Sequence, residues 1–429
     1  MTIFQEKINR FNIFLITLIS IFLIYRKVGS ILIILLFLFF LININFYKKQ
    51  NLKPYLKYIF IINIPILLEI VFFFNNDSFK GGIKSLEKSL SCLILPYIII
   101  ALYKSINYHK KLKIYSIITI VILFISFLLF RILESEYFMK FQKGIDLWQM
   151  GYVFSKFIGM HAPALNMYLS FISIFLLNET ITGIIIKNKR KTFFYFSFFI
   201  LSFFFLLLIN TRIAIIILAI NIIILFFKLK INIKTKLIIS ICISLIISIV
   251  FIVFSNKFPI AIDKFTHKTF NNLDKIGKLD EVKSPEIFVY SSLVTRLSIW
   301  KSSLELANNN YLIGVGSSDA NDELIKYYKK TNQIFLSKTK FTTHNQFLNY
   351  YLKFGILGII CCIIYLFYPL YLSIKTNNII IFFFFLNFLI SNITDDYLNK
   401  FDGLSYSSLW YSIFTCYLLN YNIKRNEKN

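Results

Sequence analysis

The stretch Asn345 to Ser373 reads NQFLNYYLKFGILGIICCIIYLFYPLYLS and decides the fold class. It is predominantly apolar and aromatic. About 20 predominantly apolar residues suffice for a helix to cross a bilayer. A helix also satisfies its own backbone hydrogen bonds, which lipid cannot do. This stretch therefore predicts a transmembrane helix.

The composition extends this prediction to the whole chain. Of 429 residues, 57% are hydrophobic and 16% are charged, and 50 are phenylalanine. Soluble domains typically carry about 45–50% apolar and about 25% charged residues. The composition thus excludes a soluble domain and predicts an all-α polytopic membrane protein. The first apolar run, Phe11 to Tyr25, lacks a small-residue cleavage site, so we expect it to remain as a helix.

Apolar runs of suitable length recur along the chain and predict about twelve transmembrane helices. The predicted spans are residues 11–25, 29–46, 54–74, 87–103, 114–131, 162–186, 192–209, 212–227, 235–255, 345–373, 377–394 and 405–421. The domain organisation expected from them is helices 1–9 over residues 1–255, an extracytoplasmic loop domain over 256–343, and helices 10–12 with a short tail over 344–429.

The distribution of charge predicts the orientation. A soluble protein with a net charge of +26 would suggest a nucleic-acid partner. Here the basic clusters, such as those at 104–113, 187–191 and 228–236, fall on alternate loops. Lys and Arg concentrate in cytoplasmic loops of membrane proteins. We therefore predict a multi-pass protein of the inner (cytoplasmic) membrane with both termini in the cytoplasm, surrounded by membrane lipids and binding no nucleic acid.

The loop between the ninth and tenth spans is long enough to fold. Loops beyond about 15 residues are uncommon unless they are functional. A helix is expected near 295–308, with Leu297, Trp300, Leu304 and Ala307 on one apolar face. A second helix is expected to open at Asp319. We predict a partly helical loop on the outer face.

His344 is the first candidate for chemistry. The segment TTHNQ resembles a capping box, with Thr343 as N-cap and Gln346 three residues later. His344 would then occupy the first helical position, where the helix dipole disfavours the imidazolium. A neutral histidine is suited to act as a general base. The alternative is a histidine that only caps a helix at the membrane surface.

Two arginines lie at similar outer positions. Arg212 follows a very short junction at the start of the eighth span, and Arg296 begins the expected loop helix. Arginine can contact a phosphate through two parallel hydrogen bonds. The alternatives are a snorkelling anchor for Arg212 and a solvated loop charge for Arg296.

An ordered set of motifs resembles the O-antigen ligase family. The set comprises Arg296 with Trp300, Gly314 with Gly316, His344-Asn345, and Gly355-Ile356 with Gly358. A Thr-Arg pair at Arg212, the twelve predicted spans and the long outer loop are also similar to that family.

The resemblance implies transfer of a glycan from a polyprenyl (undecaprenyl) diphosphate carrier, on the outer membrane face, without a metal or cofactor. Arg212 and Arg296 would bind the donor diphosphate. His344, followed by Asn345, would activate or orient the acceptor hydroxyl. That acceptor would be a lipid A core in a ligase, or the sugar end of another lipid-linked glycan in a polymerase of O-antigen, capsule or exopolysaccharide.

Weaker candidates are His161, before the sixth span, and Asp395-Asp396, after the eleventh. His161 would otherwise cap a helix, and the two aspartates would otherwise form a solvated turn. The acidic pair is suited to hold an arginine or the acceptor.

Two other classes of protein stay open. A transporter or flippase of lipid-linked sugars would carry buried charges and broken helices in mid-membrane, and the spans are nearly free of both. A structural scaffold would leave the arginines and His344 replaceable.

Overall fold

The computed structural model describes residues 3–48, 52–136, 147–229, 272–290 and 293–426, with five isolated positions between 237 and 252. Every regular element in these ranges is helical, which confirms the all-α prediction there. The predicted ninth span, 235–255, lies outside these ranges apart from the isolated positions. Four described helices are long and apolar enough to cross a membrane: α7 (Tyr108–Leu133), α10 (Ala162–Ile185), α11 (Lys189–Ile209) and α20 (Gln346–Lys375). The count of about twelve spans stays a prediction.

The described helices fall into two compact units, each considered by itself below. The first comprises Met1–Tyr115 with Phe270–Asn429, and the second comprises Ser116–Thr269, so that α7 begins in the first and continues into the second.

The first unit contains most of the elements. Before α7 come α1 (Ile3–Phe22), α2 (Arg26–Ile42), α3 (Ile44–Lys48), α4 (Leu56–Ile62), α5 (Ile64–Val71) and α6 (Phe79–Ala101), with short 3-10 turns η1 (Lys53–Tyr55), η2 (Phe73–Asn75) and η3 (Tyr103–Ser105). After the second unit come η4 (Leu273–Lys275), η5 (Leu279–Glu281), α16 (Pro285–Phe288), α17 (Leu293–Asn309), α18 (Ala320–Lys330), α19 (Ile334–Thr339), α20, α21 (Ile379–Thr394), η6 (Tyr397–Asn399) and α22 (Phe401–Asn426).

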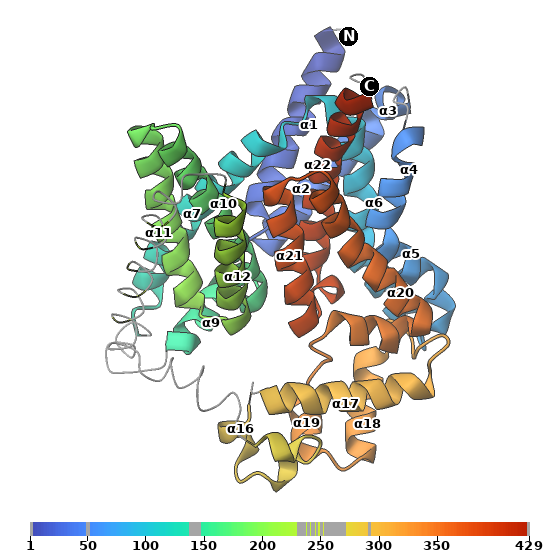
Figure 1. Ribbon diagram of the computed structural model, residues 1–429. Helices are drawn as coiled ribbons and strands as arrows, with labels where there is room; N and C mark the ends of the chain where they lie inside the picture. The colour runs from blue at the N-terminus through green and yellow to red at the C-terminus, as the bar shows by residue number, and fades with distance from the viewer. Residues whose placement is uncertain are drawn as a thin grey trace. The chain divides into compact units, whose positions relative to one another are not determined.

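Helix α22 forms the core of the first unit. Its residues 402–416 are all buried, and it packs along α6. Small side chains permit this close approach: Ser408 donates a hydrogen bond to the carbonyl of Ser91 at 3.1 Å. Helix α1 begins and α22 ends at one end of the unit, whereas α17, α18 and α19 lie at the opposite end (Figure 1).

The second unit is built around α10. It contains α9 (Leu147–Ile158), α10, α11 and α12 (Arg212–Lys228). Gly183 of α10 lies against Thr192 of α11, so that a Cβ at Gly183 would stand 2.7 Å from the Thr192 hydroxyl. At the other end of α10, the Asn166 amide donates to Thr211 Oγ1 at 2.6 Å. These contacts hold α10 against its neighbours at both ends.

The spans are not free of breaks and charges, contrary to the expectation from sequence. The predicted third span is two helices, α4 and α5, which meet at Asn63 just before Pro65. Proline removes a backbone donor, which favours such a break. The side chains of Glu69 in α5 and Lys353 in α20 are buried. These breaks and buried charges weaken the argument that the sequence offered against a transporter.

The second break lies in α20, at Gly355, whose φ is 63° and ψ is −152°. This backbone conformation is essentially restricted to glycine. The loop before α18 fills the break: Ile356 N donates to the Tyr311 carbonyl at 2.8 Å, and Val315 N donates to the Leu352 carbonyl at 2.8 Å. The turn that contains Gly314 and Gly316 in the outer loop and the break at Gly355 in the tenth span therefore form one hydrogen-bonded structure, the interlock between the loop and α20.

The described part of the outer loop packs into a hydrophobic core that it shares with α20. Buried side chains of α17, α18 and α19 include Ile299, Leu324 and Phe335, and they pack together with Leu352 of α20. Helix α18 begins where predicted, after Asp319.

The predicted apolar face of α17 is wrong in part. Leu304 is 45% exposed, whereas the small polar residues Ser298 and Ser302 are buried. The helix buries the side that carries small side chains because these allow α17 to approach its neighbours closely.

We predict that Gly355→Ala destabilises the first unit. The backbone conformation alone costs about 1–3 kcal/mol for a residue with a Cβ, and that Cβ would lie 2.4 Å from the Leu312 carbonyl oxygen. Thermal unfolding of the purified protein in detergent measures the effect. Gly159→Ala is the matched control, because Gly159 also has a positive φ but its Cβ would enter open space. An equal loss of Tm in both variants would contradict the interlock.

Candidate active site

His344 lies one residue before the N-cap of α20, which corrects the predicted capping box. The N-cap is Asn345, whose Oδ1 accepts a hydrogen bond from Leu348 N at 3.1 Å. Thr343 Oγ1 instead accepts from Asn349 at 3.2 Å, and Gln346 Oε1 accepts from Leu398 N at 2.8 Å. Asparagine is an excellent N-cap, and the Gln346 side chain is used to hold the segment after α21. His344 is therefore not in the first helical turn.

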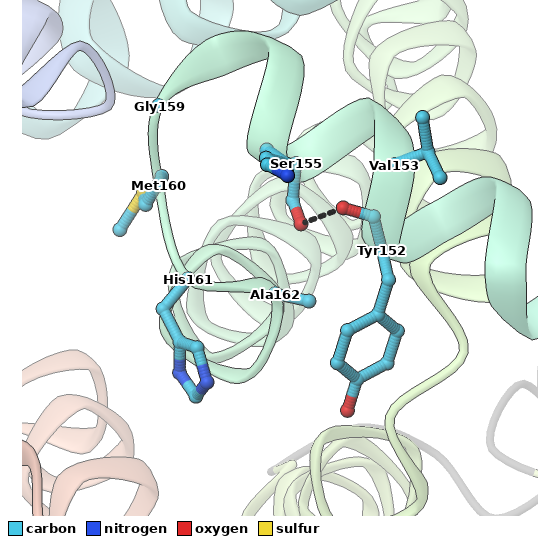
Figure 2. A pocket seen from close by; sticks show the side chains of 8 residues that line it. Tyr152, Val153, Ser155, Gly159, Met160, His161 and Ala162 are labelled. Carbon is cyan, nitrogen blue, oxygen red and sulfur yellow. Dashed lines mark hydrogen bonds between the residues drawn. The ribbon is translucent and has the colours of Figure 1, made fainter.

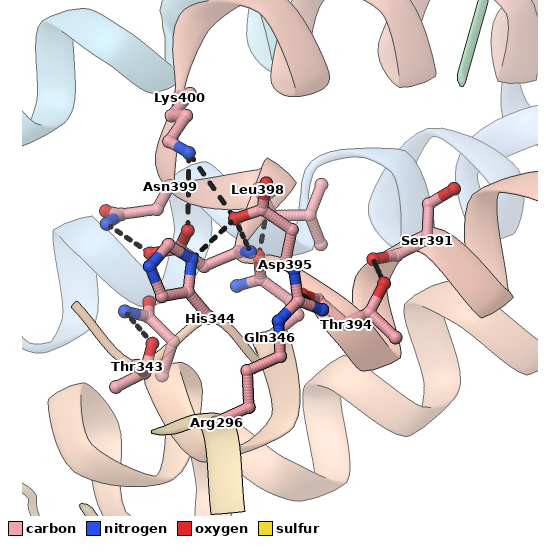
Figure 3. Close-up of polar contacts among 12 residues, drawn as sticks. Arg296, Thr343, His344, Gln346, Ser391, Thr394, Asp395, Leu398, Asn399 and Lys400 are labelled. Carbon is pink, nitrogen blue, oxygen red and sulfur yellow. Dashed lines mark hydrogen bonds and ion pairs between the residues drawn. The ribbon is translucent and has the colours of Figure 1, made fainter. Parts of the chain in front are cut away.

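The backbone of His344 is itself unusual. Its φ is 44°, in the left-handed region that few residues other than glycine adopt. The side chain is directed by this conformation toward the segment that follows α21 (Figure 3). Nonglycine residues held in such conformations cluster at functional sites.

Asp395 is the partner of His344. The two groups lie 3.4 Å apart, from Nδ1 to Oδ1. Asp395 ends α21, and its Oδ1 also accepts a hydrogen bond from the Asp396 amide at 2.9 Å. The carboxylate is buried, with 6% of the side chain exposed. With Nδ1 directed at a carboxylate, Nε2 carries the lone pair of the neutral ring.

Lys400 forms ion pairs with both aspartates. Its Nζ lies 3.4 Å from Asp395 Oδ1 and 3.5 Å from Asp396 Oδ1. Burial would raise the pKa of Asp395, but the Lys400 ammonium and the His344 hydrogen bond hold that pKa well below its usual value. Burial and the neighbouring Asp395 carboxylate raise the pKa of Asp396. Burial opposes the charge on Lys400, yet the two carboxylates raise its pKa.

Arg296 lies beside this cluster. It is in the first turn of α17, and its Nη1 donates to the carbonyl of Thr394 at 2.8 Å, directly before Asp395. Figure 3 shows the guanidinium on the same side of the α21 end as His344. A guanidinium has five N–H donors in a fixed fork, and the bond to Thr394 uses one of them to position the group. The sequence prediction that Arg296 and His344 meet is consistent with this geometry.

A polar chain links the site to the membrane-spanning part of α20. Lys353 Nζ donates to Asn399 Oδ1 at 2.6 Å, and Asn399 Nδ2 donates to Asp396 Oδ2 at 3.3 Å. Sequence reasoning missed Lys353, Asn399 and Lys400. Lys353 could have been found, because an ionisable residue inside a span is a functional candidate by default.

The other two predicted residues, Arg212 and His161, belong to the second unit. Arg212 is the first residue of α12, where Asn210 ends α11 in a left-handed conformation and Thr211 is the N-cap. His161 precedes α10 as its N-cap. The bond between Asn166 and Thr211 places the first turns of α10 and α12 at the same end of this unit.

A pocket of about 490 Å³ opens beside His161. Its lining comes from α9 and the start of α10, and includes Tyr152 and Lys156 (Figure 2). His161 is exposed, in agreement with a surface cap or a ligand contact. The pocket gives the weaker candidate His161 a local environment in which a ligand would fit.

Three side chains of the first unit have the spacing of a metal site. One ligand atom from each of His344, Asp395 and Asp396 lies within 4.8 Å of the others. Lys400, however, already contacts both carboxylates. A divalent ion would have to displace this ammonium or bear its repulsion, so these residues fit a metal poorly.

These features define the class: an integral membrane protein with a buried, charge-balanced polar site at the ends of its helices. Residues 197–363 match the family model described as O-antigen ligase, and this match supports an O-antigen ligase/polymerase family. The resemblance seen in the sequence is confirmed. The matched region contains Arg212, Arg296 and His344, and it ends before Asp395. No curated protein matches the chain. The family supports a glycosyltransferase-like membrane enzyme acting on a lipid-linked glycan.

We predict that Lys400→Met destabilises the protein and that the double variant Lys400→Met/Asp395→Asn recovers part of the loss. Removing one partner of a buried charged pair leaves the other unsatisfied, at a cost of about 1–3 kcal/mol, although Lys400 is 32% exposed and partly screened. Thermal unfolding measures the difference. A double variant less stable than the single one would contradict the pairing.

The pH dependence of this difference follows from the pKa directions. Asp395 has a lowered pKa, so its contribution is present at neutral pH and is lost as the pH falls below about 4. Lys400 has a raised pKa, so its contribution persists until the pH rises above about 10.4. The Tm difference between wild type and Lys400→Met should therefore persist from about pH 5 to about pH 9. A difference that vanishes within this range would contradict the assigned charges.

Proposed function

We propose that the protein transfers a glycan from an undecaprenyl-diphosphate carrier to a hydroxyl acceptor, as an O-antigen ligase-like enzyme. The observation that carries the proposal is His344, bonded through Nδ1 to the buried carboxylate of Asp395, with Arg296 beside it. A base, a group that orients it and a fixed cation are the parts this reaction needs.

The base works through Nε2. Because Nδ1 faces Asp395, Nε2 is the atom able to accept the acceptor's proton. The acceptor oxygen forms a bond to the anomeric carbon while the bond from that carbon to the diphosphate oxygen breaks. The bonding pair leaves with the polyprenyl diphosphate, and the proton goes to His344. A positioned general base typically contributes about 10²–10⁴-fold.

The arginines act on the leaving group. Charge grows on the diphosphate as the bond breaks, and preorganised donors stabilise it without rearranging. Arg296 is fixed by its bond to the Thr394 carbonyl. Arg212 belongs to the second unit and is assigned to the diphosphate from the sequence; it is the first residue of α12, where the positive end of the helix dipole also favours an anion. Lys400 is paired with both carboxylates and so reduces their repulsion of the diphosphate. The scheme needs no metal.

The site is assigned to the outer face of the inner membrane. Within the first unit, α17 lies at the end opposite to the start of α1 and the end of α22 (Figure 1), and the His344 site is beside Arg296 of α17. The positive-inside distribution supports cytoplasmic termini. Together these support an extracytoplasmic site, where carrier-linked glycans would be consumed.

We favour a ligase, whose acceptor is a lipid A core, over a polymerase, whose acceptor is another lipid-linked glycan. Both use the same donor chemistry, and the signature region around His344 supports the ligase only slightly.

We predict that His344→Ala and Arg296→Ala each lower transfer by at least about 10²-fold. The assay is reconstituted transfer from a polyprenyl-diphosphate-linked glycan in detergent, followed by gel mobility of the product. His109→Ala is the matched control, since His109 lies at the start of α7, at the other end of the unit. Transfer in detergent also separates an enzyme from a flippase, which yields no product without a membrane.

We predict that Asp395→Asn lowers kcat about 10–100-fold with little change in KM, because the residue positions the base. Asp396→Asn, which changes the neighbouring carboxylate that does not contact His344, should have a smaller effect. Addition of a chelator should leave wild-type transfer unchanged. Loss of transfer with chelator would contradict the metal-free scheme, and equal effects of the two substitutions would contradict the role of Asp395.

A further inference from the structure

A polar pocket of about 290 Å³ lies at the end of the first unit remote from His344. It is formed by the start of α4, the last turns of α20 and Leu418 of α22. Tyr108 of α7 contacts both Asn378, just after α20, and Tyr417, just before Leu418. The pocket therefore lies at the end of the unit where α7 begins and α22 ends.

The chemistry of the lining selects an anion. Two lysines, Lys57 and Lys375, contribute positive charge, and Tyr58, Tyr368 and Tyr371 contribute hydroxyl groups. The Lys57 ammonium lies over the Tyr368 ring, 4.9 Å from its centroid, which holds it at the pocket. No carboxylate is among the lining residues. The carboxyl end of α20 contributes about half a negative charge, which two ammonium groups outweigh.

The surroundings of the pocket are those of a lipid-facing surface. On the same two helices, Phe60, Phe367 and Ile374 are exposed large apolar side chains. A segment of α20 from Ile356 to Lys375, at 1.5 Å per residue, spans about 30 Å, the thickness of a bilayer core. The pocket thus lies about one membrane thickness from the His344 site, at the level of lipid head groups.

We propose that this pocket binds a phosphate-bearing anion at the membrane surface opposite to the His344 site. An anionic phospholipid such as phosphatidylglycerol supplies that chemistry together with acyl chains for the exposed apolar side chains. A soluble phosphate ester supplies the phosphate alone. The proposal is independent of the glycan-transfer reaction.

The test is thermal unfolding of the full-length protein in detergent. Three additions are compared: phosphatidylglycerol, zwitterionic phosphatidylcholine, and glycerol 3-phosphate. The variant is Lys57→Gln/Lys375→Gln, both exposed positions at which glutamine preserves much of the side-chain length. The matched control is Lys104→Gln/Lys110→Gln, which removes two exposed charges at the same end of the unit, one of them also beside a tyrosine ring.

We expect phosphatidylglycerol, but not phosphatidylcholine, to raise the Tm of wild type and of the control variant. The pocket variant should bind the lipid at least about tenfold more weakly than wild type does. The same pattern with glycerol 3-phosphate would support the site and identify a soluble ligand. The proposal is overturned if no anionic addition raises the Tm, if the pocket variant responds as wild type does, or if the control variant loses the response equally. Should the double variant not fold, Lys57→Gln alone is tested against Lys104→Gln.

Discussion

The candidate active site depends on a break in a membrane helix that only another backbone can fill. Helix α20 cannot continue its hydrogen bonds through Gly355, and the loop before α18 supplies the missing partners. Because lipid offers no hydrogen bonds, an unfilled break in this place would cost several kcal/mol. The loop is thereby attached to α20 by hydrogen bonds between backbone groups. Nine residues of α20 precede the break, and His344 lies on their N-terminal side. The helix and the loop together hold these nine residues in place.

The same attachment explains why the site combines residues so distant in sequence. Arg296 comes with α17, whose core includes Leu352 of α20. Asp395 comes with the end of α21, which Gln346 holds through Leu398. A loop domain that moved independently of α20 would place Arg296 and His344 at variable distances. A fixed one keeps the cation and the base in one geometry, which is the condition for preorganised catalysis.

The sequence was sufficient for the class of protein and for naming His344, Arg296 and Asp395 as candidates, and insufficient for their contacts. Hydropathy indicated α10 and α20 because crossing a bilayer places a strong constraint on length and composition. Motif order indicated Arg296 and His344. The predicted N-cap was wrong because Thr343 and Asn345 are both good N-cap residues. The hydrogen bond between Thr343 and Asn349 and the one between Gln346 and Leu398 decided between them.

Local patterning could not reveal the partners of those residues. Lys400 is five residues from Asp395 in a short turn, where nothing in the sequence distinguishes it from a solvated lysine. The burial that makes it important is produced by packing of η6 against α20 and α22. Leu304 was misplaced for a similar reason, since an apolar pattern does not show which side of a short helix finds neighbours.

The buried charges alter the comparison between an enzyme and a transporter. Breaks and ionisable residues within spans are features of transporters, and both occur here. Their placement, however, does not follow the transporter pattern. The break at Gly355 is occupied by protein backbone, and Lys353 is bonded to Asn399 below the aspartate pair. In a transporter, a break exposes its backbone groups to the transported solute; here those groups are already satisfied. The arrangement instead forms a rigid polar support for His344. A rigid support favours catalysis over the alternating access that a transporter needs.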